Sequence, residues 1–341
     1  MNKEIRIGKL FSIKIWVTDD DKNIDEWSRP KKFIIIKIIT TEGVEGWGEA
    51  FSIHLREKAI VAITIALFKE ISKIENLSLN SFYNNVSLLS DGHKGLDFSS
   101  ATSAIEIALW DIAGKLKNTP LNKLLTNNPK PDVPIYATCW SDLKKDQGDY
   151  LDKVEQYFEK KYGGIKIYPL FEDTSNSVKF VERARKIVGM EYPLMLDLAI
   201  PEDLNQTKGF LKEVSFLNPY WIEEPVDGEN ISLLAEIKNS FDMKIVTGEK
   251  QSGFVHFKEL ITRNAADILN PDISGIGGII DMLKVSNEAL NNDIAISPHC
   301  WNSMSVSASA MLHVCSSIPN SERAEIFPNY IEFSKEFCEL P

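Results

Sequence analysis

The stretch "MKIVTGEKQSGFVHFKELITRNAADILNPD", residues 243–272, contains one full copy of the pattern that decides the fold. A short apolar segment ends in a glycine and an acid, then a polar loop and an amphipathic helix follow, and a second apolar segment ends in another acid. The same unit recurs along most of the chain. Eight such strands are predicted, at residues 134–139, 163–168, 192–198, 218–224, 243–249, 266–272, 293–299 and 323–327.

Strands that alternate with helices form a parallel sheet. Eight units favour a closed (β/α)8 barrel over an open dinucleotide-binding sheet, and no GxGxxG motif follows the first strand. The predicted fold class is therefore α/β, with a TIM-like barrel over residues 129–341.

The N-terminal residues, 1–128, have a different pattern and predict a separate α+β domain. A linker rich in proline and asparagine, "NNPKPDVP", marks its end, and the acidic stretch "TDDDKNIDEWSRP" is expected to form a loop. Antiparallel strands are predicted within residues 3–17 and 31–50, and helices at 57–76 and 99–117.

Composition excludes several classes of protein. The 341 residues include 38 Lys and Arg against 49 Asp and Glu, a net charge of −11, and no basic cluster that could follow a phosphate backbone, so no nucleic-acid partner is expected. Apolar runs such as "FIIIKII" are too short to span a bilayer, and the N-terminus lacks a signal-peptide core. Four scattered cysteines indicate reduced thiols, so we expect a cytoplasmic protein without membrane partners.

Acidic residues end three successive predicted strands. Asp197, Glu223 and Glu249 are each 26 residues apart, about one strand–helix unit. In a barrel the carboxyl ends of the strands meet on one face, so these side chains should lie together. Three clustered carboxylates repel one another unless a hard cation such as Mg²⁺ binds between them. The spacing therefore predicts a metal site.

The next two strands end in Asp272 and His299. Alone, a histidine in this position is more often a structural group. Beside an aspartate it can form a dyad, in which the carboxylate fixes the imidazole tautomer and raises its basicity. The pair therefore predicts a general base.

Taken in order, these segments resemble the enolase superfamily, in its mandelate racemase-like subgroup. The similarity covers nearly the whole chain and is carried by "TTEGVEGWGEA", "SAIEIALWDIAGKLKNTPLNKLL", "IKIY", "LDLAI", "WIEEP", "TGEK", "LNPDISGIGGIIDMLKVS" and "SPHCW". It implies an N-terminal capping domain over a modified barrel, an essential Mg²⁺ on the three acids, and a His299–Asp272 dyad that removes a proton to form a metal-stabilised enediolate. It also implies a homo-oligomer.

The resemblance assigns further positions on the second and eighth strands. Members that racemise their substrates carry Lys-x-Lys on the second strand, whereas this chain has Lys166 and then Tyr168. A phenol is a poor base at neutral pH but could donate a hydrogen bond or a proton. Lys166 would lie near the metal and the substrate carboxylate, or would pair with the ligand carboxylates. Glu325 would contact the enediolate oxygen if protonated, or would form a structural salt bridge.

Two departures from the family pattern are visible. Ala199 stands where members often have a polar residue that can act as the general acid. The chain also ends at Pro341, before the segment that usually returns to the capping domain, which suggests a truncated chain.

Substrate choice in this family lies with capping-domain loops. Charged loops of this kind are more often simply solvated. The resemblance nevertheless implies candidate substrate contacts for Trp27 in the acidic loop, which could close over the site, and for His54 and Arg56 after the last predicted N-terminal strand. Trp301 and Asn302, just after His299, could line the same pocket, although Trp301 could equally belong to the core.

These observations predict a Mg²⁺-dependent lyase that dehydrates a sugar acid, an aldonate or an aldarate, with a small-molecule carboxylate as its substrate. One histidine can take the α-proton and then protonate the departing β-hydroxyl. The alternative enzyme activity is that of a racemase, epimerase or cycloisomerase, which would use Tyr168 or Lys166 as its second catalytic group. A barrel that binds metal and ligand without turnover is the alternative of another class.

Overall fold

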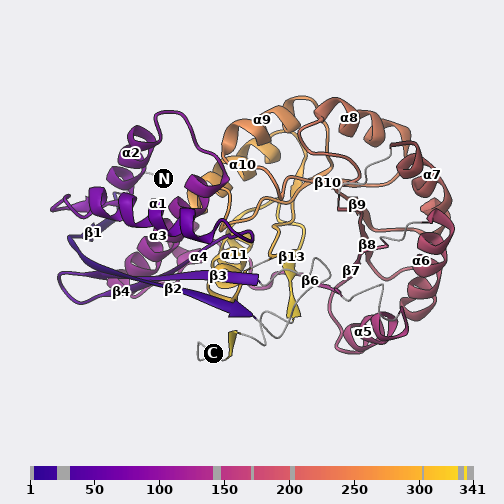
Figure 1. Cartoon of the computed structure of the whole chain (residues 1–341), viewed down its shortest axis with the longest axis horizontal. Helices are drawn as coiled ribbons and strands as arrows, with labels where there is room; N and C mark the ends of the chain where they lie inside the picture. The colour runs from indigo at the N-terminus through magenta and orange to yellow at the C-terminus, as the bar shows by residue number, and fades with distance from the viewer. Residues whose placement is uncertain are drawn as a thin grey trace.

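The computed structural model of the chain describes residues 4–20, 31–140, 147–169, 173–199, 204–301, 303–328 and 334–335. Two parts lie side by side (Figure 1). In one, a small sheet lies against helices from the first third of the chain. In the other, an arc of helices surrounds a ring of short strands.

The N-terminal part is built on a three-stranded antiparallel sheet of β2 (Leu10–Asp20), β3 (Lys31–Thr40) and β4 (Glu45–Ala50). β3 is apolar from residue 33 to residue 36 because both of its faces are buried there. Ile34, Ile36 and Ile38 join the large core, whereas Phe33 and Ile35 join a smaller cluster that also contains Met304 and Phe327. Each sheet face therefore packs against a different layer.

β4 alternates glycines with large side chains. A Cβ atom on Gly46 would lie 2.1 Å from the carbonyl oxygen of Ala108, and one on Gly48 would lie 1.9 Å from that of Ala104. Both carbonyls belong to α3 (Leu96–Lys117), so the helix backbone touches the strand directly. The opposite face of β4 carries Trp47 and Glu49, as period-2 alternation requires.

The other N-terminal elements are α1 (Glu57–Ile71), α2 (Leu79–Ser90), α4 (Leu121–Leu125) and the short antiparallel pair of β1 (Arg6–Gly8) and β5 (Leu77–Ser78). The predicted strands and both predicted helices are confirmed, with α1 ending five residues early. Helices α2 and α4 were not predicted from the periodicity of the sequence. A capping box between Ser78 and Ser81 starts α2.

All eight predicted barrel strands are confirmed. They form one parallel sheet in the order β12-β11-β10-β9-β8-β7-β6-β13. Beyond the paired ladders, the backbone N–H of Ile296 donates to Asn320 and that of Glu322 donates to Ile296, which joins β12 to the segment before β13 and closes the ring. The strands are β6 (Ile135–Thr138), β7 (Ile165–Ile167), β8 (Leu194–Asp197), β9 (Trp221–Glu223), β10 (Ile245–Thr247), β11 (Ile268–Leu269), β12 (Ala295–Ile296) and β13 (Ala324–Ile326).

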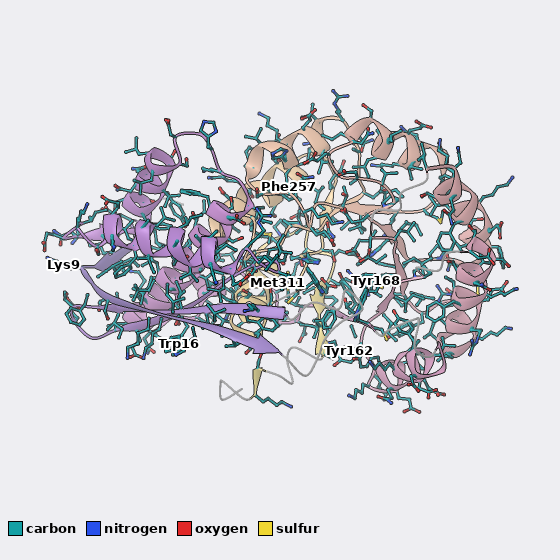
Figure 2. The ribbon with its side chains drawn as sticks, in the orientation of Figure 1. Lys9, Trp16, Tyr162, Tyr168, Phe257 and Met311 are labelled. Carbon is teal, nitrogen blue, oxygen red and sulfur yellow. The ribbon has the colours of Figure 1, made fainter. Side chains whose placement is uncertain are left out.

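Helices follow these strands and lie on the outside of the ring (Figure 1). Their apolar faces cover the strands, and Phe257 and Met311 lie in this buried layer (Figure 2). The helices are α5 (Gln147–Glu159), α6 (Thr174–Val188), α7 (Leu204–Val214) with the 3-10 turn η1 (Ser215–Leu217), α8 (Ile231–Ser240), α9 (Phe254–Thr262), α10 (Ile279–Leu290) and α11 (Ser305–Ser317).

Two expectations from composition can be compared with the structure. Cys139, Cys300 and Cys315 are buried free thiols, and Cys338 lies outside the described residues. Burial raises the pKa of Cys139 to about 12, so that thiol is unreactive. Within the part of the chain that the structure describes, no helix combines the length and the apolar character needed to cross a membrane.

Candidate active site

The three predicted metal ligands meet at the carboxyl ends of the barrel strands. Asp197 and Glu223 end β8 and β9 and are direct register partners, and Glu249 lies two residues beyond β10. One carboxylate oxygen from each residue lies within 4.8 Å of the others. The even spacing along the sequence therefore becomes a single cluster in space.

This cluster has the chemistry of a divalent cation site. Burial raises the pKa of Glu223 to about 8 and that of Glu249 to about 7, since charged carboxylates lose their hydration there. The Oε2 atom of Glu249 is buried and accepts no hydrogen bond. Three convergent oxygen ligands, one of them unsatisfied, fit a hard cation such as Mg²⁺.

Lys166 lies among these carboxylates and is fully buried. Its Nζ is 2.7 Å from Glu223 and 3.3 Å from Asp197, and it also lies 2.9 Å from Glu325. Burial alone lowers the pKa of Lys166, but Glu223 and Glu325 raise it well above its ordinary value. The side chain is therefore a fixed positive charge beside the acid cluster.

Glu325 on β13 is fully buried and accepts hydrogen bonds at both oxygens. Oε1 accepts from the Thr138 hydroxyl and from Lys166, and Oε2 accepts from the backbone N–H of Cys300 at 2.7 Å. Burial raises its pKa, but Lys166 and His299 together lower it to about 2. Of the two alternatives left by the sequence, these contacts favour the salt bridge over a protonated donor.

The predicted dyad is formed. Nδ1 of His299 lies 2.9 Å from Oδ2 of Asp272, and Oδ1 of Asp272 accepts from the backbone N–H and the hydroxyl of Ser274 at 2.8 and 2.6 Å. Nε2 of His299 faces the acid cluster, 3.4 Å from Glu249 and 4.0 Å from Glu325. Burial lowers the pKa of His299, but these two carboxylates raise it to about 10.

Tyr168 follows β7 and is buried against Trp140, with ring centroids 4.5 Å apart. The ammonium of Lys166 lies 5.7 Å from the centre of its ring. Burial raises the pKa of the phenol well above its ordinary value, so the group is neutral. This environment agrees with the expectation that Tyr168 is a poor base.

The structure describes only some of the predicted substrate-binding residues. Trp301 is partly buried, with its ring 6.2 Å from that of Phe51 at the end of β4. Nε of Arg56 lies 2.9 Å from Asp97, so this guanidinium already has an acidic partner in the N-terminal part. Nδ1 of His54 is buried without a hydrogen-bond partner. Trp27 and Asn302 lie outside the described residues.

Two residues that support the acid cluster were missed in the sequence. Nδ2 of Asn270 donates to Oε1 of Glu223 at 3.0 Å, and Nε1 of Trp221 donates to Oε2 of the same residue at 3.2 Å. Each stands two residues before a predicted site residue, Asp272 or Glu223. Side chains two apart on a strand share a face, so the alternation was an available signal.

The backbone also holds one of the candidate ligands, Asp197, in place. Ala199 has a φ of 49°, in the left-handed region, and its N–H donates to Oδ1 of Asp197 at 2.9 Å. Its methyl group cannot act as an acid, as the sequence indicated. Lys250, the neighbour of Glu249 in the sequence, lies 3.9 Å from the buried Glu224.

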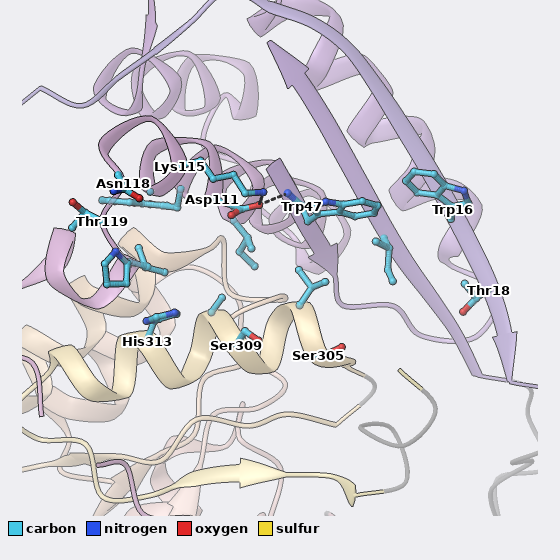
Figure 3. Close-up of a pocket in the computed structure, with 18 of the residues that line it drawn as sticks. Trp16, Thr18, Trp47, Asp111, Lys115, Asn118, Thr119, Ser305, Ser309 and His313 are labelled. Atoms are coloured by element: carbon cyan, nitrogen blue, oxygen red, sulfur yellow. Dashed lines mark hydrogen bonds and ion pairs between the residues drawn. The ribbon is translucent and has the colours of Figure 1, made fainter. Parts of the chain in front are cut away.

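A cavity of about 1080 Å³ lies elsewhere, between the N-terminal sheet, α3 and α11. Trp16 and Trp47 stack at one side of it, and Asp111, Lys115 and His313 also line it (Figure 3). Of the predicted site residues that the structure describes, none lines this cavity. The acid cluster and the dyad therefore form a separate site at the strand ends.

Comparison with known proteins agrees with this architecture. Residues 27–126 match the mandelate racemase / muconate lactonizing enzyme N-terminal domain, and residues 149–339 match the family described as enolase C-terminal domain-like. The chain belongs to the enolase superfamily. Its members include the mandelate racemase-like group that the motifs indicated.

Three relatives of this superfamily member are informative. A crystal structure of an enolase from environmental sequencing of the Sargasso Sea is 72% identical, with a TM-score of 0.95, over 99% of this chain and 90% of that one. L-talarate/galactarate dehydratase of Salmonella typhimurium is 29% identical over 78% of this chain and 67% of the relative. D-galactonate dehydratase of Verminephrobacter eiseniae is 26% identical over 80% of this chain and 72% of the relative.

Proposed function

We propose that this protein is a Mg²⁺-dependent lyase that removes water from a sugar acid. The observation that carries the proposal is the placement of His299 Nε2 opposite the cluster of Asp197, Glu223 and Glu249, with Asp272 behind the imidazole. Two curated relatives named as sugar-acid dehydratases support the substrate class.

The chemistry follows from the charge on the substrate. A proton beside a carboxylate is very weakly acidic, because its removal puts a second negative charge on the same small molecule. A bound divalent cation supplies positive charge at the carboxylate oxygens. The ammonium of Lys166, held within 3.3 Å of two of the proposed ligands, adds a second positive charge that needs no rearrangement during the reaction.

His299 would move the proton. With Asp272 accepting from Nδ1–H, a neutral imidazole would direct its Nε2 lone pair toward the acid cluster and the substrate. The negative charge of Glu249 contributes to the raised pKa of His299. A cation held by Glu249 would offset that charge and lower the pKa of His299 toward the range that a base needs. After taking the α-proton at Nε2, the same imidazolium donates it to the departing β-hydroxyl, and water leaves.

A second base is not supplied by the groups nearby. The ion pairs of Lys166 keep it protonated, and Tyr168 is a neutral phenol. Racemisation by two bases on opposite faces is therefore less favoured than dehydration with one histidine.

The test is a screen for keto-acid formation. Purified protein with Mg²⁺ is incubated with a library of mono- and diacid sugars, and each reaction is repeated in EDTA. A product lost in EDTA is expected, and it would identify the substrate. If no sugar acid yields a keto acid, α-proton exchange in D₂O is measured. Exchange with inversion of configuration would indicate a racemase or epimerase, and no exchange would indicate a binding protein.

A further inference from the structure

The end of β4 reaches across to the barrel. Glu49 is fully buried on the face of β4 that also carries Trp47. Its Oε1 accepts from the backbone N–H of Met304 at 2.5 Å, and its Oε2 accepts from that of Ser307 at 2.9 Å. These N–H groups belong to the start of α11, whose own N-cap residue provides no side-chain cap. A glutamate from the N-terminal part therefore caps a barrel helix.

The capped helix begins directly after the segment that carries His299. Figure 3 shows the start of α11 at Ser305, with Trp47 of β4 beside the same helix. One residue before the N-cap of α11, the hydroxyl of Ser303 lies 3.1 Å from that of Ser274. Ser274 in turn donates to Oδ1 of Asp272 at 2.6 Å.

Further contacts link the residue after β4 to the segments that carry Asp272 and His299. The backbone N–H of Phe51, one residue beyond β4, donates to the carbonyl of Ser274 at 3.0 Å. The ring of Phe51 also lies 6.2 Å from that of Trp301, which is two residues after His299. Residues 49 and 51 thus touch both segments that hold the dyad.

We propose that Glu49 is a positioning residue for the His299–Asp272 dyad. It acts through the start of α11, the Ser303–Ser274 contact and Asp272, and it touches neither the imidazole nor a substrate. The inference rests on the proposed function in so far as the dyad is the base. Small displacements of a catalytic group cost large factors in rate, so fixing the segment around His299 matters to turnover.

The same chain provides a matched control. Glu106 of α3 is also fully buried and also caps a barrel helix, since its Oε1 accepts from the backbone N–H of Ile280 in α10 at 2.9 Å. The N-cap of α10, Gly278, likewise provides no side-chain cap. Glu106 has no described contact with Ser274, Ser303 or either member of the dyad.

The test compares Glu49→Gln with Glu106→Gln. Glutamine keeps the shape, but its amide nitrogen cannot accept, so in Glu49→Gln one of the two backbone N–H groups at the start of α11 loses its partner. In Glu106→Gln the amide oxygen can keep the bond from Ile280, because Oε2 of Glu106 has no hydrogen-bond partner. Four quantities are measured for each variant: the free energy of unfolding, kcat, KM, and the ¹H–¹⁵N imidazole resonances without substrate. The chain has 5 histidines, and the spectrum of His299→Asn assigns the signal of His299.

We expect only Glu49→Gln to lose stability through an unpaired N–H at its cap, to shift the His299 resonances and to lower kcat by about tenfold to a hundredfold with KM unchanged. Unshifted His299 resonances and unchanged kcat in Glu49→Gln would overturn the proposal and leave Glu49 as a structural cap. If Glu49→Gln does not fold, Ser303→Ala takes its place, because it breaks the link to Ser274 and keeps the cap. An unshifted His299 signal in Ser303→Ala would equally overturn the proposal.

The resonances also separate this inference from the proposed function. They are recorded without substrate, so they report on the position of His299 whatever reaction the protein catalyses. A blank keto-acid screen would count against the lyase and leave the comparison of resonances to decide the role of Glu49.

Discussion

Replacing Lys166 with methionine should expose the repulsion that this lysine balances. Its ammonium lies within 3.3 Å of Glu223, Glu325 and Asp197, and no part of the side chain is exposed. Methionine preserves the apolar stem but leaves these buried carboxylates without their cation. Removing one partner of a buried ion pair costs about 3–5 kcal/mol. We expect the free energy of unfolding at pH 8 in EDTA to fall by that amount.

The cost should shrink as the pH falls. Burial raises the pKa of Glu223 to about 8 even while Lys166 lowers it, so removal of Lys166 raises it further. A carboxyl whose pKa is raised in the folded state stabilises the protein below its unfolded pKa, and this stabilisation is lost as the pH rises through the folded value. The variant should therefore lie closer to the wild type at acidic pH than at pH 8.

The assay is urea unfolding followed by tryptophan fluorescence, in EDTA and again in Mg²⁺. A cation that binds only the folded state should recover part of the loss. Lys250→Met is the control, because its half-exposed ammonium lies 3.9 Å from Glu224 and should matter by less than about 1 kcal/mol. Equal losses in the two variants would refute the reasoning, as would a Lys166→Met loss below about 1 kcal/mol at pH 8.

Three further predictions concern the proposed ligands, the base and a buried carboxyl. Asp197→Asn should weaken Mg²⁺ binding in isothermal titration by at least about tenfold, the scale seen when a metal site loses a partner; unchanged affinity would place the cation elsewhere. His299→Asn should lower turnover by at least about a hundredfold and leave Mg²⁺ binding intact; full activity would exclude His299 as the base. Burial raises the pKa of Glu106 from 4.5 to about 8, so its stabilising contribution is complete below pH 4.5 and lost as the pH rises through 8. Glu106→Gln should flatten that decline in the free energy of unfolding, and parallel curves for the two proteins would contradict this.

The barrel strands could be predicted because their burial is reflected in their mostly apolar composition. Segments such as Ile165–Ile167 and Leu194–Asp197 are buried at every residue, so they are apolar apart from the charged site residues Lys166 and Asp197, and polar loops bound them. By contrast, α2 was missed because its sequence, "LNSFYNNVSLLS", is rich in asparagine and serine and reads as a loop. Its start signal was present as Ser78 and Ser81, a capping box without the usual glutamate or glutamine.

For the candidate site, it could be predicted from the sequence which strand ends meet. Asp197, Glu223 and Glu249 follow from spacing alone, because a closed barrel turns equal spacing into proximity. The pairing of Arg56 with Asp97 does not follow from spacing, since it depends on how a loop packs against a helix 41 residues further along the chain. The choice of partner for Glu325 likewise needs the first and last strands to be neighbours in the ring.

The bare glycine face of β4 bears on how this protein could be re-engineered. Gly46 and Gly48 let the strand lie on the backbone of α3, and Glu49 on its other face holds the start of α11. A chimera that takes its N-terminal module from a relative would have to exchange β4 and α3 as one block, and would have to keep a hydrogen-bond acceptor at position 49. A crossover point inside residues 46–51 would separate parts that fit only each other.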